Sequence, residues 1–277
     1  MRLGNVVVVG FGLISIVIAG FVSWNWRQLP LKFPSLLTAE SERRERLRQS
    51  IRTVGGVFTA GAIAGVLVLG VVGRLVMRIL GATSGNAQGK LTDAGEIVGE
   101  ITFGGSFAFL VFVGLGGGIV SAAGYLFIRT WLPAKAGLAG LIFGILVIGT
   151  LGVSDALAPE NVDFAILRPL WLAILLIVGT GFLFATTFTA IAARLDQFAQ
   201  TKGRGRGLLY PAFIFGAIPP VGAAMVVQVA LRTFGDKKFF AVVHGTASRT
   251  LGRIVVAAGT AVTAFLAISA AVDILTA

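Results

Sequence analysis

Two arginines and three acids flank one predicted loop, and their spacing is the pattern in this chain best suited to chemistry. Arg74 and Arg78 are four residues apart, so they share one face of a helix. Glu96 and Glu100 have the same spacing after the loop, and Asp93 lies just before them. A helical hairpin would bring both pairs to one end of the molecule, where opposite charges neutralise each other. The cluster predicts either an ion pair that fixes the loop or a polar vestibule that binds a charged solute or ion.

Other titratable residues are candidates for acid–base chemistry. Asp155, Glu160 and Asp163 lie in one acidic loop, which Pro159 interrupts, and His244 is the single histidine. A membrane enzyme would need Asp155, Glu160 or His244 as its acid or base. The sequence does not arrange these groups toward one another, so we expect a solvated loop and an interfacial histidine.

The composition excludes several kinds of cofactor site. The chain has no cysteine and one histidine, which rules out disulfides, thiolate metal sites and haem held by two histidines. Gly85 precedes Gly89-Lys90 at too short a spacing for a phosphate-binding loop, and Leu91 follows where serine or threonine is needed. We therefore predict no cofactor and no metal.

Long uncharged stretches dominate the chain and predict the fold class. Hydrophobic residues make up 56% and charged residues 13%, against about 25% charged in an average soluble domain. Twenty apolar helical residues cross a hydrocarbon core of about 30 Å. We predict an all-α, polytopic transmembrane helix bundle of about seven spans, which occupy about 4–24, 53–78, 101–128, 136–154, 168–193, 207–231 and 253–274.

The chain is expected to form one integral membrane domain over residues 1–277. The first apolar segment exceeds a signal-peptide core and lacks a small-residue cleavage site, so it is interpreted as an uncleaved span. A basic linker at 27–52 follows it, with a short helix expected from Ser41 to Arg52 and an N-cap at Thr38 or Ser41.

Basic residues predict the orientation and the partners. The net charge of +11 favours cytoplasmic loops that lie against anionic lipid headgroups, and we expect no nucleic-acid partner. The bias favours an N-terminus outside and a C-terminus inside, and we expect the membrane to be a plasma membrane of bacterial type. The basic stretch 232–253 fits this poorly, because seven spans put it outside. In the alternative, Pro219-Pro220 breaks segment 207–231, which re-enters and leaves on one side, and the last span ends outside.

Small and aromatic residues predict packing and boundaries. Gly61 with Gly65, and Gly140 with Gly144, are four apart and predict close helix contacts, within one chain or in a homo-oligomer. The aromatic residues near predicted span ends form an expected interfacial belt: Tyr125, Trp131, Trp171 and Tyr210. No acidic residue falls at the centre of a predicted span, which argues against an ion-coupled transporter.

Three function classes follow from these patterns. The first is a structural or accessory subunit of a membrane assembly, with a membrane-protein partner or a second copy of the chain. The second is a transporter or channel for a small solute or ion, which would use the Arg74 cluster and the broken segment. The third is a membrane enzyme. The sequence carries no signal for a particular substrate.

Overall fold

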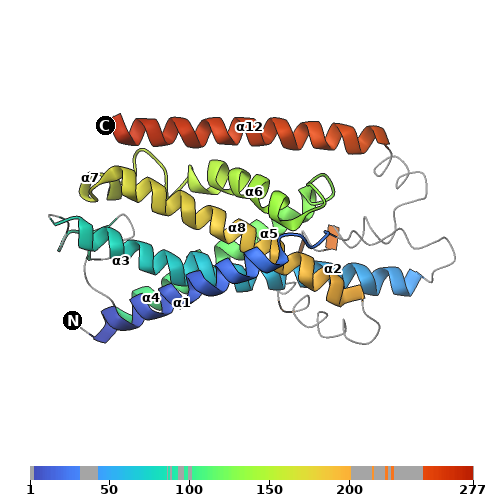
Figure 1. Cartoon of the computed structure of the whole chain (residues 1–277), viewed down its shortest axis with the longest axis horizontal. Coiled ribbons are helices and arrows are strands. Elements are labelled where there is room, and N and C mark those ends of the chain that lie inside the picture. The colour runs from blue at the N-terminus through green and yellow to red at the C-terminus, as the bar shows by residue number, and fades with distance from the viewer. Residues whose placement is uncertain are drawn as a thin grey trace.

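The structure is a computed structural model in which helices run lengthwise along the molecule (Figure 1). It describes residues 3–31, 43–85, 87, 89–92, 97–98, 102–200, 214, 222–223, 226–227 and 246–276. Strand-like pairing among these residues is limited to two isolated antiparallel bridges, Pro30 with Lys135 and Leu91 with Ile97. The helical part of the predicted fold class is therefore confirmed.

Six passes along the molecule follow one another in the described chain (Figure 1). The first pass is α1 (Leu3–Trp26), and the second joins α2 (Arg43–Ala64), the π-helical η1 (Gly65–Val72) and α3 (Gly73–Thr83). The third joins α4 (Phe103–Phe109), η2 (Leu110–Gly116) and α5 (Gly117–Ile128), and the fourth joins α6 (Ala136–Val147) and η3 (Ile148–Gly152). The short α7 (Asp163–Ile166) precedes the fifth, α8 (Leu170–Gln200), and α12 (Thr246–Thr276) is the sixth.

Five of these helices are long and apolar enough to cross a membrane. They are Val6–Trp26, Leu47–Thr83, Phe103–Ile128, Leu170–Phe198 and Ser248–Thr276, and Ala136–Gly152 is a shorter apolar helix. The predicted segment 207–231 lies outside the described residues apart from five scattered positions. The helix expected to lead out of the basic linker is present from Arg43 and continues unbroken into the second pass, whereas its expected N-caps Thr38 and Ser41 lie outside the described residues.

The core lies around α8, which packs against α1, α2 and α6. Aromatic rings fill its centre: the centroid of Phe188 lies 4.9 Å from that of Tyr125 and 5.5 Å from that of Phe143. Phe58 and Phe184 are also fully buried. Burial of such large apolar side chains stabilises a fold by about 1.5–3 kcal/mol each when the alternative is water.

Glycines let the second and third passes approach backbone to backbone. A Cβ atom added to Gly61 would lie 2.5 Å from the carbonyl oxygen of Gly118, and one added to Gly65 would collide with the carbonyl of Gly114. A Cβ on Gly140 would lie 2.5 Å from the Thr189 hydroxyl of α8. Only residues without a side chain permit contacts this close.

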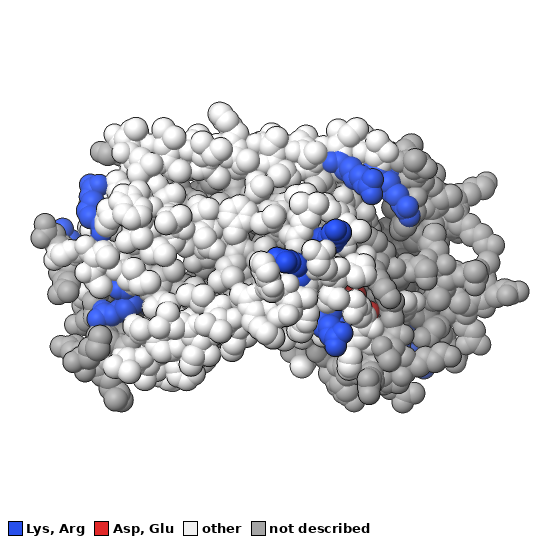
Figure 2. Space-filling model, in the orientation of Figure 1, with Lys and Arg blue, Asp and Glu red and all other residues white. Residues whose placement is uncertain are grey.

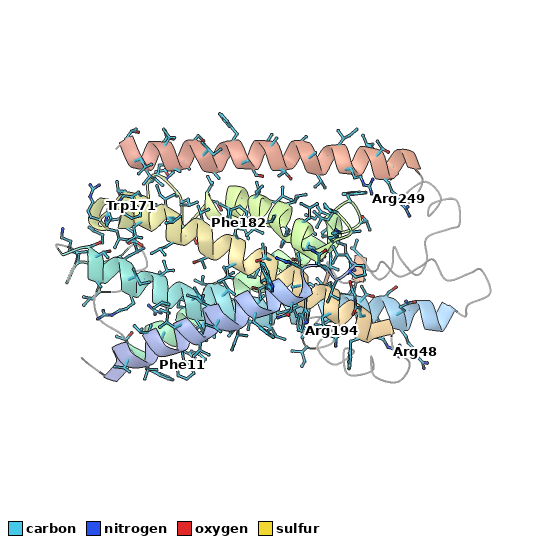
Figure 3. The ribbon with its side chains drawn as sticks, in the orientation of Figure 1. Phe11, Arg48, Trp171, Phe182, Arg194 and Arg249 are labelled. Atoms are coloured by element: carbon cyan, nitrogen blue, oxygen red, sulfur yellow. The ribbon has the colours of Figure 1, made fainter. Side chains whose placement is uncertain are left out.

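The last helix runs in the direction of α6. Along α12, Gly252 contacts Trp131, Gly259 faces Leu146, and Thr263 contacts Gly149. Because α6 and α8 are antiparallel, Thr246 starts at the end of the molecule where α8 finishes (Figure 1). Arg48, Arg194 and Arg249 accordingly lie at one end and Trp171 at the other (Figure 3).

This direction bears on the predicted topology. A seven-span arrangement would start the last helix at the opposite end, so that its C-terminus would share an end with the linker after α1. Instead the chain leaves α8 and enters α12 at the same end, as in the alternative with a re-entrant segment. Leu3 and Thr276 therefore lie at the same end of the bundle, whereas the seven-span prediction set the two termini on opposite sides.

Candidate functional site

A buried ion pair joins the third and fifth passes. Arg129 directly follows α5, and Asp196 lies one turn before the end of α8. The Arg129 Nη2 atom donates a hydrogen bond to Asp196 Oδ2 at 2.6 Å. The two side chains are 0% and 4% exposed. Within the residues that the structure describes, these are the only buried charged side chains.

Tyr125 stands one helical turn before Arg129 and on the same face. The Arg129 guanidinium carbon lies 5.8 Å from the centroid of the Tyr125 ring. The ring also makes edge contacts with Phe143 and Phe188. Its hydroxyl is buried and has no hydrogen-bond partner among the described residues. The ion pair is thus covered on one side by an aromatic wall.

The energetics of this arrangement favour a structural role. A buried guanidinium keeps its proton because arginine is not deprotonated in proteins. Loss of one partner from such a pair costs about 3–5 kcal/mol, since the other charge stays buried and unpaired. Asp196 therefore compensates the charge of Arg129 and links α5 to α8.

A groove on the outer surface lies at the same end of the molecule. It has a volume of about 420 Å³ and runs between the end of α1 and the start of α6. Trp24, Arg27 and Lys135 lie at its polar end, and Leu138 and Leu141 line its apolar part. The Arg27 guanidinium carbon lies 3.4 Å from the centroid of the Trp24 ring. A second, apolar groove of about 240 Å³ lies between η3, α8 and α12.

Backbone hydrogen bonds hold the two walls of the outer groove together. The Leu31 N–H donates to Ala134 O at 2.7 Å, and the Gly137 N–H donates to Arg27 O at 2.9 Å. A Cβ on Gly137 would lie 2.9 Å from the Arg27 Cβ, so glycine permits this approach. The pairing brings the walls that carry Arg27 and Lys135 together, and no acidic residue lines the groove.

Charge is distributed unequally between the two ends. Eleven of the fifteen described lysines and arginines belong to segments at the end that holds the ion pair. The opposite end carries Asp155, Glu160, Asp163 and Asp273. Figure 2 shows blue side chains toward both ends of the visible face, with a broad uncharged band between them. This band and its charged borders have the pattern of a membrane-embedded surface.

The predicted polar cluster is described only in part. The Arg74 guanidinium carbon lies 4.9 Å from the centroid of the Phe109 ring, and both Arg74 and Arg78 are half-buried. Asp93, Glu96 and Glu100 lie outside the described residues, as do Pro219, Pro220 and His244. Asp155 and Glu160 are exposed in the loop before α8. Among the described residues, no three metal-ligating side chains form a group.

Tyr125 does not belong to the expected interfacial aromatic belt. Tyr125 is fully buried in the core rather than interfacial, because the aromatic face of α5 packs on α8. The helix that contains the predicted fifth span, 168–193, continues to Gln200, and Asp196 in this continuation is buried.

Arg129 and Asp196 were not recognised as a site from the sequence. Both lie beside loop cations near the ends of predicted spans, where a charge ordinarily reaches water. The usable signal was the single acid Asp196 between Arg194 and a run of three further basic residues, Lys202, Arg204 and Arg206. A lone carboxylate in a basic stretch predicts a specific cationic partner.

Comparison with protein-family models, curated proteins and solved structures identifies no match to this chain. The arguments for its function therefore come from its own residues: five long apolar helices and one buried ion pair that joins two of the passes.

Proposed function

We propose that this chain is a multi-pass integral membrane protein that serves as a structural or accessory subunit of a membrane assembly. The observation that carries the proposal is the closed interior of the described bundle. Its buried charges pair with each other, aromatic rings fill its centre, and glycine contacts join its second and third passes. An interior of this kind is suited to holding a shape rather than conducting a solute.

The outer surface supports the membrane location. Large apolar side chains are exposed on every long helix, among them Phe11 on α1, Phe112 on η2 and Phe265 on α12. Exposed apolar area on this scale is stable against lipid tails and unstable against water.

The charge asymmetry gives an orientation for this membrane protein. Cytoplasmic segments carry the excess of lysine and arginine. The end that holds Arg48, Arg194 and Arg249 is then cytoplasmic, and Leu3 and Thr276 are outside. The proposal thus keeps the predicted location of the N-terminus outside the cell, in a plasma membrane of bacterial type.

An aromatic face offers a surface for the partner subunit. Phe103 and Phe107 of α4 are exposed and stack on each other, with ring centroids 6.3 Å apart and an interplanar angle of 14°. Phe112 of η2 is exposed one to two turns further along. Aromatic side chains are enriched where protein surfaces associate.

Two measurements test this proposal. Alkaline carbonate extraction of membranes from expressing cells should leave the chain in the membrane pellet. Purification in a mild detergent should then recover a stoichiometric protein partner or a defined homo-oligomer, and substitution of Phe103 and Phe112 by serine should release it. A chain that stays in the membrane as a lone monomer would contradict the subunit role.

A transporter or channel is the second candidate. The π-helical segments η1 and η2 face each other across the glycine contacts, and wide helical turns of this kind often occur at functional sites. Reconstituted liposomes loaded with ions or small solutes test it directly. Flux that depends on Arg74 would favour transport over the subunit role.

A further inference from the structure

We propose that the groove between α1 and α6 binds one anionic phospholipid, with its phosphate at Arg27 and Lys135 and one acyl chain along Leu138 and Leu141. The proposal rests on the membrane location argued above and adds a defined lipid site to it. The cytoplasmic leaflet is the source of the lipid, because these cations lie at the basic end of the molecule.

The polar end of the groove carries two positive charges. Arg27 and Lys135 both line the groove, and neither forms an ion pair with a described residue. The backbone bonds between residues 27–31 and 134–137 hold the two walls that carry these like charges side by side, which is unfavourable in the absence of an anion. A phosphate diester between them would accept charge-assisted hydrogen bonds from both.

Beyond the two cations the lining of the groove becomes apolar. The Ser23 hydroxyl lies 3.0 Å from the Thr187 hydroxyl and also reaches Thr186, so its hydrogen-bonding capacity is engaged inside the protein. Gly20, Leu138 and Leu141 line the groove further from its polar end and supply apolar surface. A ligand that is anionic at one end and apolar along its length matches this order of side chains.

The indole of Trp24 indicates the depth of the groove in the membrane. It is exposed, and Arg27 stacks on its face. Tryptophan prefers the headgroup region of a bilayer. Trp24 therefore marks the depth at which lipid phosphates lie, and Arg27 is held at that same depth.

The test uses the purified full-length chain in a neutral detergent, with native mass spectrometry to count bound lipid. Dioleoyl phosphatidylglycerol and dioleoyl phosphatidylcholine are the two probes, because they share acyl chains and differ in charge. We expect the anionic lipid to bind about thirtyfold more tightly. Each of the two basic side chains contributes about 1 kcal/mol toward a headgroup of net negative charge, whereas choline offsets the phosphate charge of phosphatidylcholine. Equal binding of the two lipids would overturn the proposal.

Three variants locate the site. Arg27→Gln with Lys135→Gln should abolish the preference for the anionic lipid. Arg249→Gln with Arg253→Gln removes the same charge from exposed positions of α12 at the same end and should keep it. Leu141→Trp fills the apolar part of the groove without a charge change and should weaken binding of the anionic lipid. Equal losses in both charge variants would show diffuse attraction and overturn the defined site.

Two further experiments complete the test. Competition with inorganic phosphate distinguishes a bound lipid from a bound soluble anion, and carbonate extraction distinguishes failure of the lipid site from failure of the membrane proposal. If inorganic phosphate displaces the lipid at millimolar concentration and Leu141→Trp has no effect, the groove binds a free anion and the lipid assignment fails. Carbonate extraction is run on the same samples. A chain that leaves the membrane contradicts the proposed location, whereas an embedded chain without lipid preference contradicts only the groove.

Discussion

Two arginines at the same end of this molecule have opposite surroundings. Arg129 is fully buried, shares a 2.6 Å hydrogen bond with Asp196 and lies against the ring of Tyr125. Arg27 stacks on an exposed tryptophan at the mouth of an open groove, beside Lys135. An acidic partner inside the protein thus makes a cation part of the framework. A cation that lacks such a partner and faces the outside remains able to bind a ligand.

The largest expected effect comes from removing the acid of the buried pair. Asp196→Ala leaves the Arg129 guanidinium buried without its carboxylate and should lower the free energy of unfolding by about 3–5 kcal/mol. Thermal unfolding in detergent, followed by intrinsic fluorescence and by recovery of monodisperse protein, measures this loss. The double variant Arg129→Met with Asp196→Leu should recover most of it, because neither charge then stays buried. A single variant as stable as the parent would remove the difference between the two arginines.

An exchange of arginine for lysine should affect the two positions differently. Arg129→Lys keeps the charge but loses the planar guanidinium that reaches Asp196, and should destabilise the fold by about 1–3 kcal/mol. Arg27→Lys should leave unfolding unchanged and keep anionic lipid binding within about threefold, since the exposed site needs charge more than shape. Both are measured by thermal unfolding with and without phosphatidylglycerol. Equal sensitivity of the two positions would contradict the assigned roles.

A smaller effect is expected at the tyrosine beside the ion pair. Tyr125→Phe removes a buried hydroxyl that has no hydrogen-bond partner among the described residues. The free energy of unfolding of this variant should rise by up to about 1 kcal/mol, because the cost of desolvating the hydroxyl disappears. Tyr125→Leu serves as the control that also loses the ring contacts with Phe188 and should be destabilised. A clear loss of stability in Tyr125→Phe would mean that the hydroxyl supports the ion pair.

The smallest expected effect belongs to the groove cations. Arg27→Gln with Lys135→Gln should change the free energy of unfolding in neutral detergent by less than about 0.5 kcal/mol, as is usual for surface substitutions. The variant should differ from the parent only when lipid is added: phosphatidylglycerol should no longer raise its unfolding temperature. A large loss of stability without lipid would place these cations in the framework with Arg129.

Parts of the fold follow directly from residue patterns. The uncharged stretches around 4–24, 101–128 and 253–274 become long helices in the structure because hydropathy is a property of composition along the chain. The glycines at 61 and 65 lie against the third pass, where their spacing had suggested a close helix contact. Charged residues near span ends were harder to interpret. Arg129 and Asp196 look like loop residues in sequence, and only the packing of α5 on α8 removes them from water.

The direction of the last helix needed the tertiary structure. A count of basic residues allows an outer or an inner start for α12, since the stretch 232–253 contradicts one topology and fits another. The contacts of Gly252 with Trp131 and of Thr263 with Gly149 set α12 parallel to α6. They also place the start of the helix beside the end of α8.

Composition and periodicity are enough to predict a helical chain with long apolar helices and to exclude cysteine chemistry, because these properties do not depend on contacts between distant residues. The tertiary structure decided which charges are paired inside, which remain at the surface, and which end of the molecule gathers the cations. Those outcomes depend on contacts between residues far apart in the chain, such as positions 129 and 196. The local pattern of residue types does not reveal which distant positions come into contact.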